Sequence, residues 1–73
     1  MRLSEFRQAL KDEFGEDYGR VLTRDLILTA FGRTADQALA VGASARDVWL
    51  ALCAETDVPE SRRYGAGRPA ART

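Results

Sequence analysis

The chain has 73 residues, which is enough for one small domain and leaves little room for an enclosed ligand pocket. Hydrophobic residues make up 45% of it and charged residues 30%, as in an ordinary soluble globular protein. Eleven Lys and Arg balance eleven Asp and Glu, and one cysteine without any histidine argues against a disulfide framework and against metal centres built on His or paired Cys.

The first predicted element is an amphipathic helix over about residues 4–14. The Ser4 hydroxyl can accept a hydrogen bond from a free amide of the first turn, so Ser4 is the predicted N-cap. Gly15 supplies the left-handed residue that ends the helix. The apolar side chains recur every three or four residues, as one buried helix face requires: Leu3, Phe6, Leu10 and Phe14.

The next stretch predicts two short helices, over about residues 16–22 and 24–31, rather than a single long one. Continuing one helical period would place Asp25 in the middle of the apolar face, where a carboxylate without a partner is costly. A break near this residue is therefore favoured, with Thr23 or Asp25 as a cap, and Gly32 is expected to close the second helix. That face is defined by three side chains: Tyr18, Val21 and Leu22.

Capping signals predict two further helices. Thr34 and the glutamine three residues later have the spacing of a capping box, and the short helix that they open is expected to end at Gly42. Ser44 opens the best-defined helix, over about residues 45–56. Pro59 prevents this helix from continuing, because proline biases the preceding residue away from helical geometry.

The predicted fold is all-α, a compact bundle of four or five short helices over residues 1–59, because no segment shows a strand or hairpin pattern. Residues 60–73 are predicted to form a flexible basic tail, which carries four arginines and one glutamate. The core is expected to consist of large apolar side chains from each helix: Phe6, Leu10, Phe14, Val21, Leu22, Leu28, Phe31, Leu39, Val48, Trp49 and Leu52.

Several short motifs along residues 1–63 resemble those of a known family, the short actinobacterial proteins grouped as domain of unknown function 3046. The resemblance implies a small helical protein without an assigned activity, and it offers no catalytic residues to transfer. The motifs that carry it are Met1–Phe6, Asp12–Gly15, Arg24-Asp25, Thr34 with Ala38-Leu39 and Gly42, the run Val48-Trp49 with Ala51-Leu52-Cys53, and Val58-Pro59.

No group of residues in the sequence predicts catalysis, a bound cofactor or a metal site, and the chain is expected not to be an enzyme. Cys53 lies among apolar residues in the later turns of its helix, which indicates a small buried hydrophobe rather than a nucleophile. The carboxylates around Gly15 fit no calcium loop and are expected to stabilise the start of the second helix. Arg24 and Asp25 are interpreted as an ion pair or a helix cap.

The leading functional prediction is a small cytoplasmic protein-interaction or regulatory module. A lone cysteine and the lack of a secretory signal favour a reducing compartment. The predicted contact with a protein partner consists of Trp49, Leu50 and Arg46 on the last helix, because a tryptophan in so small a body could remain partly exposed and anchor an interface.

The alternative is a nucleic-acid-binding protein that uses a helix-turn-helix-like corner over Thr34–Ala54, the basic tail, or both. Gly42 would be the turn glycine, and Ala38 and Val48 have the spacing of the two residues that pack such a corner. Arg46 is the sole cation of the would-be recognition helix, which argues against this alternative because phosphate neutralisation dominates duplex affinity. The tail would contribute four phosphate contacts: Arg62, Arg63, Arg68 and Arg72.

Overall fold

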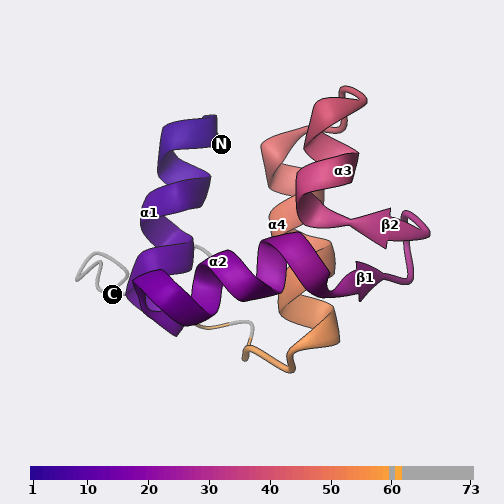
Figure 1. Ribbon diagram of the computed structural model, residues 1–73. Helices are drawn as coiled ribbons and strands as arrows, with labels where there is room; N and C mark the ends of the chain where they lie inside the picture. Colours follow the sequence, from indigo (N-terminus) through magenta and orange to yellow (C-terminus); the bar gives the residue numbers. More distant parts are fainter. Residues whose placement is uncertain (60, 62–73) are drawn as a thin grey trace.

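The computed structural model describes residues 1–59 and residue 61 (Figure 1). In Figure 1, α1 and α4 stand upright, α2 runs from the lower end of α1 across the front of α4 towards a small hairpin, and α3 stands beside α4. Both α1 and α3 contact α2 and α4, so the four helices share one core. Over residues 1–59 the elements are α1 (Leu3–Phe14), α2 (Glu16–Asp25), β1 (Ile27–Leu28), β2 (Arg33–Thr34), α3 (Ala35–Ala40) and α4 (Ala45–Glu55).

The first helix begins one residue earlier than predicted, with Arg2 as its N-cap. The Glu5 carboxylate accepts a hydrogen bond of 2.7 Å from the Arg2 backbone amide, so the start of α1 is stabilised by an acidic residue of its first turn. The prediction that Ser4 caps this helix is therefore wrong. Gly15, with φ of +86°, ends α1 as predicted and also precedes the first residue of α2.

The second helix is longer than predicted and is followed by a hairpin rather than by another helix. α2 continues to Asp25, and the expected helix over 24–31 is replaced by β1, a turn and β2, which pair antiparallel. The fold is thus mostly helical with a two-stranded sheet, and the all-α prediction needs this correction. In the sheet, Ile27 is opposite Thr34 and Leu28 is opposite Arg33.

The physical reason for the difference is the choice of buried face. α2 buries Gly19, Leu22 and Thr23, whereas Val21, which was predicted in the core, is 41% exposed. Asp25 consequently lies on the outside, where it pairs with Arg24, and no break is needed to keep it out of the core.

Neighbouring residues of β1 then point to opposite sides of the hairpin. Ile27 is 54% exposed and Leu28 is fully buried, as the period of two in a strand dictates. Gly32, at φ of +67°, occupies the left-handed position that returns the chain to β2, and its amide donates to the Leu28 carbonyl at 2.8 Å. Ile27 and Leu28 are therefore adjacent apolar residues that a strand places on opposite sides, so that Leu28 enters the core and Ile27 stays outside.

The caps of the two later helices are confirmed. The Thr34 hydroxyl accepts from the Gln37 amide at 3.2 Å, and the Gln37 side chain accepts from the Thr34 amide at 3.0 Å, which completes the capping box of α3. The Ser44 hydroxyl accepts from the Asp47 amide at 3.0 Å and caps α4. Gly42, at φ of +99°, lies in the turn between them.

The core lies between the four helices and is completed by Leu28 of β1 and by Val58. Phe14, Phe31 and Leu39 are only partly buried and pack against it. It contains most of the predicted large side chains together with several small ones that were not predicted, and its members are Phe6, Ala9, Leu10, Leu22, Leu28, Ala35, Ala38, Val48, Trp49, Leu52, Cys53 and Val58.

Candidate functional site

The corner between α3 and α4 consists of two helices joined by a turn, and its residues have the spacing of a helix-turn-helix. Ala38 and Val48, the two residues with diagnostic spacing, are both fully buried, as such a corner requires. Gly42 provides the turn and Ser44 caps the second helix. Residues Thr34–Ala54 therefore form two helices joined by a turn at Gly42.

The side chains that α4 would use to contact a partner are, however, largely covered. Trp49 is 1% exposed, and its ring meets the rings of Phe6 and Phe14 edge-on, with centroids 6.0 and 6.3 Å apart. Cys53, one turn later, is fully buried, as its apolar neighbours predicted. The hypothesis that Trp49 is an exposed interface anchor is corrected, because α1 covers this face of α4.

What remains on the surface of α4 carries little positive charge. Arg46 is exposed and Leu50 is half-buried against the core. Asp47 and Glu55 are also exposed on α4 and would repel phosphate. The structure therefore separates the three predicted contact residues, with Arg46 on the surface, Leu50 at its margin and Trp49 in the interior.

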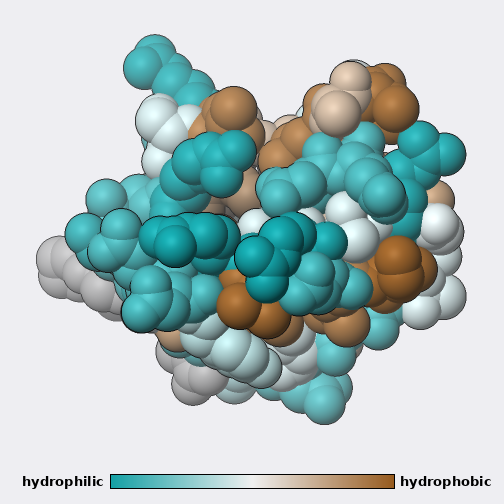
Figure 2. Space-filling model, viewed as in Figure 1, coloured by the Kyte–Doolittle hydropathy of each residue, from teal (hydrophilic) through white to brown (hydrophobic). Residues whose placement is uncertain are grey.

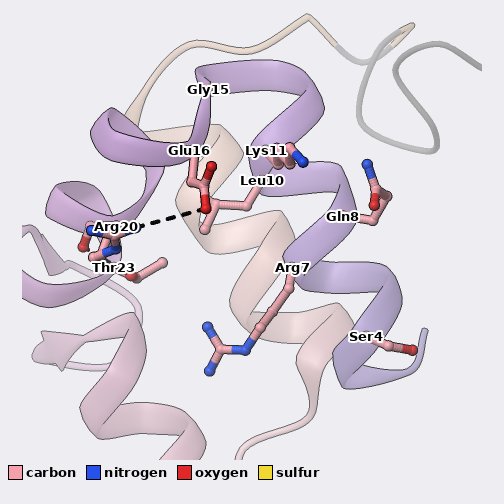
Figure 3. A pocket seen from close by; sticks show the side chains of 9 residues that line it. All are labelled: Ser4, Arg7, Gln8, Leu10, Lys11, Gly15, Glu16, Arg20 and Thr23. Atoms are coloured by element: carbon pink, nitrogen blue, oxygen red, sulfur yellow. Dashed lines mark hydrogen bonds and ion pairs between the residues drawn. The ribbon is translucent and has the colours of Figure 1, made fainter.

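A surface hollow of about 490 Å³ lies between α1 and α2 (Figure 3). Leu10 is its one large apolar residue, and most of the others carry charges or hydrogen-bonding groups. Figure 3 shows that α1 and α2 supply its two sides, with Gly15 at the turn that joins them. The lining residues are Ser4, Arg7, Gln8, Leu10, Lys11, Gly15, Glu16, Arg20 and Thr23.

The two helices pack closely beside this hollow, at Gly19 and Leu10. A Cβ atom built on Gly19 of α2 would lie 2.9 Å from Leu10 Cγ of α1, which is closer than carbon atoms can pack. The glycine therefore lets the helices approach at this point.

The hollow carries an excess of positive charge. Arg7, Lys11 and Arg20 line it together with a single carboxylate, that of Glu16. Within residues 1–59 and 61, neither Arg7 nor Lys11 forms an ion pair. These two side chains are four residues apart, so they project from the same flank of α1.

Arg20 is held only loosely. Its guanidinium lies 3.9 Å from the Glu16 carboxylate and 4.0 Å from that of Asp17, and all three side chains are mostly exposed. Exposed pairs at such distances contribute little to stability. Glu16 and Asp17 lie in the first turn of α2, where the helix dipole favours acidic residues, in keeping with the structural role predicted for the carboxylates around Gly15.

The other charged groups singled out in the sequence form local contacts. Arg24 and Asp25 form a two-point ion pair, with both nitrogen–oxygen distances at 3.1 Å, and the hydrogen bond from Arg24 lowers the pKa of the Asp25 carboxyl. Over the described residues, no three His, Cys, Asp or Glu side chains are grouped so that they could hold a metal ion.

Sequence reasoning did not find the hollow. Its one local signal is the four-residue spacing of Arg7 and Lys11, which places both on the polar side of the first helix but does not reveal that α2 lies beside them. The four tail arginines predicted to contact nucleic acid lie outside the described residues: Arg62, Arg63, Arg68 and Arg72.

Comparison with known families finds one matching model, described as a protein of unknown function (DUF3046), over residues 1–61. The match covers the whole helical body and confirms the resemblance seen in the sequence. No curated protein and no solved structure matches the chain. Among the described residues, no helix combines the length and the apolar character that crossing a bilayer requires.

Proposed function

The chain belongs to the DUF3046 family, and from this premise we propose that it is a small non-enzymatic interaction module that binds a protein partner in the cytoplasm. The observation that carries the proposal is the hollow between α1 and α2, because Arg7 and Lys11 project from its wall without ion-pair partners among the described residues. Surface charges of this kind direct partner recognition and accelerate association.

The position of the reactive groups supports a binding role over catalysis. Cys53, the sole thiol of the sequence, is fully buried in the core, where a substrate cannot reach its sulfur. The hollow is open and polar, whereas sites for small molecules are concave and mostly apolar. An open, charged surface on two packed helices suits a macromolecular partner better.

Affinity purification with the full tagged chain, expressed in cells that contain its natural partners, tests this proposal. A specific partner should be recovered with the wild type and lost with the double variant Arg7→Glu/Lys11→Glu. The matched control is Arg33→Glu/Arg46→Glu, which changes the net charge equally on exposed residues of β2 and α4 and should retain the partner.

Two outcomes would contradict the proposal. Failure to recover any specific partner with the wild type would exclude a stable interaction module. Loss of the partner with Arg33→Glu/Arg46→Glu, but not with the double variant in α1, would move the interaction to the α3–α4 corner. Circular dichroism of each variant verifies that the helices are intact.

A mobility-shift titration separates this proposal from the nucleic-acid alternative. Binding of duplex or single-stranded DNA that weakens steeply between about 50 and 200 mM salt would favour the alternative. Truncation after Pro59 would abolish binding by the tail, whereas binding by the corner would survive truncation and be lost with Arg46→Glu. No shift at low salt would leave the protein-interaction proposal as the supported one.

A further inference from the structure

We propose that the hollow between α1 and α2 is a docking site for an acidic segment of a partner protein, whose Asp or Glu side chains pair with Arg7, Lys11 and Arg20. This inference rests on the proposed function and specifies its partner chemistry. Figure 3 shows these three cations, with Arg20 directed at Glu16 across the α2 side of the hollow.

The first argument is charge complementarity. Three cations and one carboxylate line the hollow, so its local charge is positive although residues 1–58 carry a net charge of −3. A ligand with discrete carboxylates can place them on the cations. Arg7 and Lys11 lie one helical turn apart, with Cβ atoms about 5–6 Å from each other, which matches two acidic side chains one turn apart on a partner helix.

The same charges disfavour a polyphosphate chain as the occupant. Glu16 lines the hollow itself, and Asp12 and Asp17, which are both exposed, lie next to its lining residues in sequence. A nucleic acid carries a charge at every nucleotide and would bring phosphates close to these carboxylates. A peptide can leave uncharged residues at those positions, so the observations favour an acidic protein segment.

The second argument concerns the pairing of Arg20 with Glu16. The contact is 3.9 Å long and mostly exposed, so it contributes little and is easily exchanged. An incoming carboxylate can replace Glu16 as the partner of Arg20. In the absence of the ligand, Glu16 acts as an internal competitor that keeps the positive charge of the hollow partly neutralised.

The third argument is an exposed apolar residue beside the cations. Leu3 is 49% exposed and precedes Arg7 by one helical turn, so the two lie on the same flank of α1. Figure 2 shows a hydrophobic area over this end of α1, above the hydrophilic surface of α2. A segment that combines acidic residues with one apolar residue could contact both.

The experiment uses the full chain and a synthetic helical peptide with paired glutamates one turn apart and a neighbouring leucine. Titrations are followed by ¹⁵N NMR. The peptide should shift resonances of α1 and of Arg20, and the variant Arg7→Gln/Lys11→Gln should weaken its affinity by about tenfold, because two charge contacts are lost. The variant Glu16→Gln should tighten binding by about threefold, because it removes the competitor of the ligand.

The controls are Arg33→Gln/Arg46→Gln, which should leave the affinity unchanged, and the same peptide with glutamine in place of glutamate, which should not bind. Inorganic phosphate and a DNA duplex serve as separate probes. The proposal is overturned if Glu16→Gln weakens peptide binding, if the control variant weakens it equally, or if DNA competes better than the peptide. These variants lie on exposed residues, and amide dispersion verifies their folding.

Different results would contradict this inference and the proposed function. Recovery of a partner that is insensitive to Arg7→Glu/Lys11→Glu would retain the interaction module and remove the hollow as its site. Peptide binding at the hollow without any recoverable cellular partner would retain an acidic-segment site and contradict the proposed function.

Discussion

Trp49 shows how a single side chain joins two parts of this fold. Its indole belongs to α4, and both of its aromatic neighbours, Phe6 and Phe14, belong to α1. The rings meet at 88° and 67°, the edge-to-face arrangement that aromatic quadrupoles favour. Removal of the indole would therefore open the main contact between α1 and α4.

We predict that Trp49→Ala lowers the free energy of unfolding by about 3–5 kcal/mol, the usual cost of such a cavity. A single core of this size rarely supplies more than about 3–5 kcal/mol in total, so the variant should be largely unfolded. Leu50→Ala, at a half-buried position, should cost only about 1 kcal/mol. Circular dichroism should show Trp49→Ala largely unfolded in buffer, whereas urea unfolding measures the smaller loss of Leu50→Ala. A Trp49→Ala variant as stable as Leu50→Ala would contradict the core role of Trp49.

Gly19 is a position where the general preference for alanine in helices should be reversed. Alanine is favoured over glycine by about 1 kcal/mol in a helix interior. Its Cβ would nevertheless lie 2.9 Å from Leu10 Cγ, an atom in the middle of a buried side chain, so Leu10 would have to shift. Overpacking of this kind costs about 1–3 kcal/mol.

We therefore expect Gly19→Ala to destabilise the protein by about 1 kcal/mol, as measured by urea unfolding. In a Leu10→Ala background the clash is absent, and the same substitution should be neutral or stabilising. A double-mutant cycle measures this difference directly. If Gly19→Ala stabilises the wild type, the helices do not need the glycine for their approach.

At the scale of elements, the helix caps could be predicted from the sequence and the hairpin could not. A cap depends on residues three apart, such as Thr34 and Gln37, so its signal is local. β1 and β2 have two residues each, which is too short for a period of two to be recognised. Their pairing depends on Leu28 reaching the core, a tertiary effect that overrides local propensity.

The hairpin is tied to α4 by hydrogen bonding between Thr29 and Glu55. The Glu55 carboxylate, in the last turn of α4, accepts from the Thr29 backbone amide at 2.8 Å. Hydrogen bonds from the Thr29 side chain and amide lower the pKa of Glu55, because they favour its charged form. A carboxylate near a helix C-terminus interacts unfavourably with the helix dipole, and the hydrogen bonding to Thr29 offsets this cost.

We predict that this contact makes part of the stability depend on pH. Because the pKa of Glu55 is lower in the folded than in the unfolded chain, its contribution is present above the ordinary glutamate pKa of about 4.3 and is lost as pH falls through the folded value. Urea unfolding of the wild type and Glu55→Gln across this range should show the difference between them shrinking towards acid.

Comparing the wild type with Glu55→Gln isolates the contribution of the Glu55 carboxyl. Asp25, whose pKa is also lowered, is present in both proteins, so its contribution cancels in the difference between them. A difference between the two proteins that stays constant across the acidic range would show that the charge of Glu55 does not contribute. A difference that grows towards acid would reverse the expected sign.

At the scale of the whole molecule, the core residues found among positions 1–59 and 61, the part that the structure describes, all lie at or before Val58. We therefore predict that a chain ending at Pro59 folds by itself and that its free energy of unfolding is within about 0.5 kcal/mol of the full chain. Circular dichroism and urea unfolding of the two lengths measure this. A loss of cooperativity on truncation would show that later residues belong to the folded domain.

The candidate site illustrates the limit of sequence reasoning at this scale. Arg7 and Lys11 could be placed on one polar flank from their spacing alone, but Arg20 belongs to another helix. That the three cations share a hollow depends on how α1 and α2 meet at Gly19. The partial exposure expected for Trp49 was wrong for the same reason, because the burial of this side chain depends on where α1 lies over α4.

Binding of a ligand in the hollow would affect the core through α1. One of its flanks carries Arg7 and Lys11, and another carries the two phenyl rings that touch the indole of Trp49. Trp49 is the sole tryptophan of the chain. Its intrinsic fluorescence thus offers a label-free optical reporter, one whose signal originates from a ring that the ligand itself never touches.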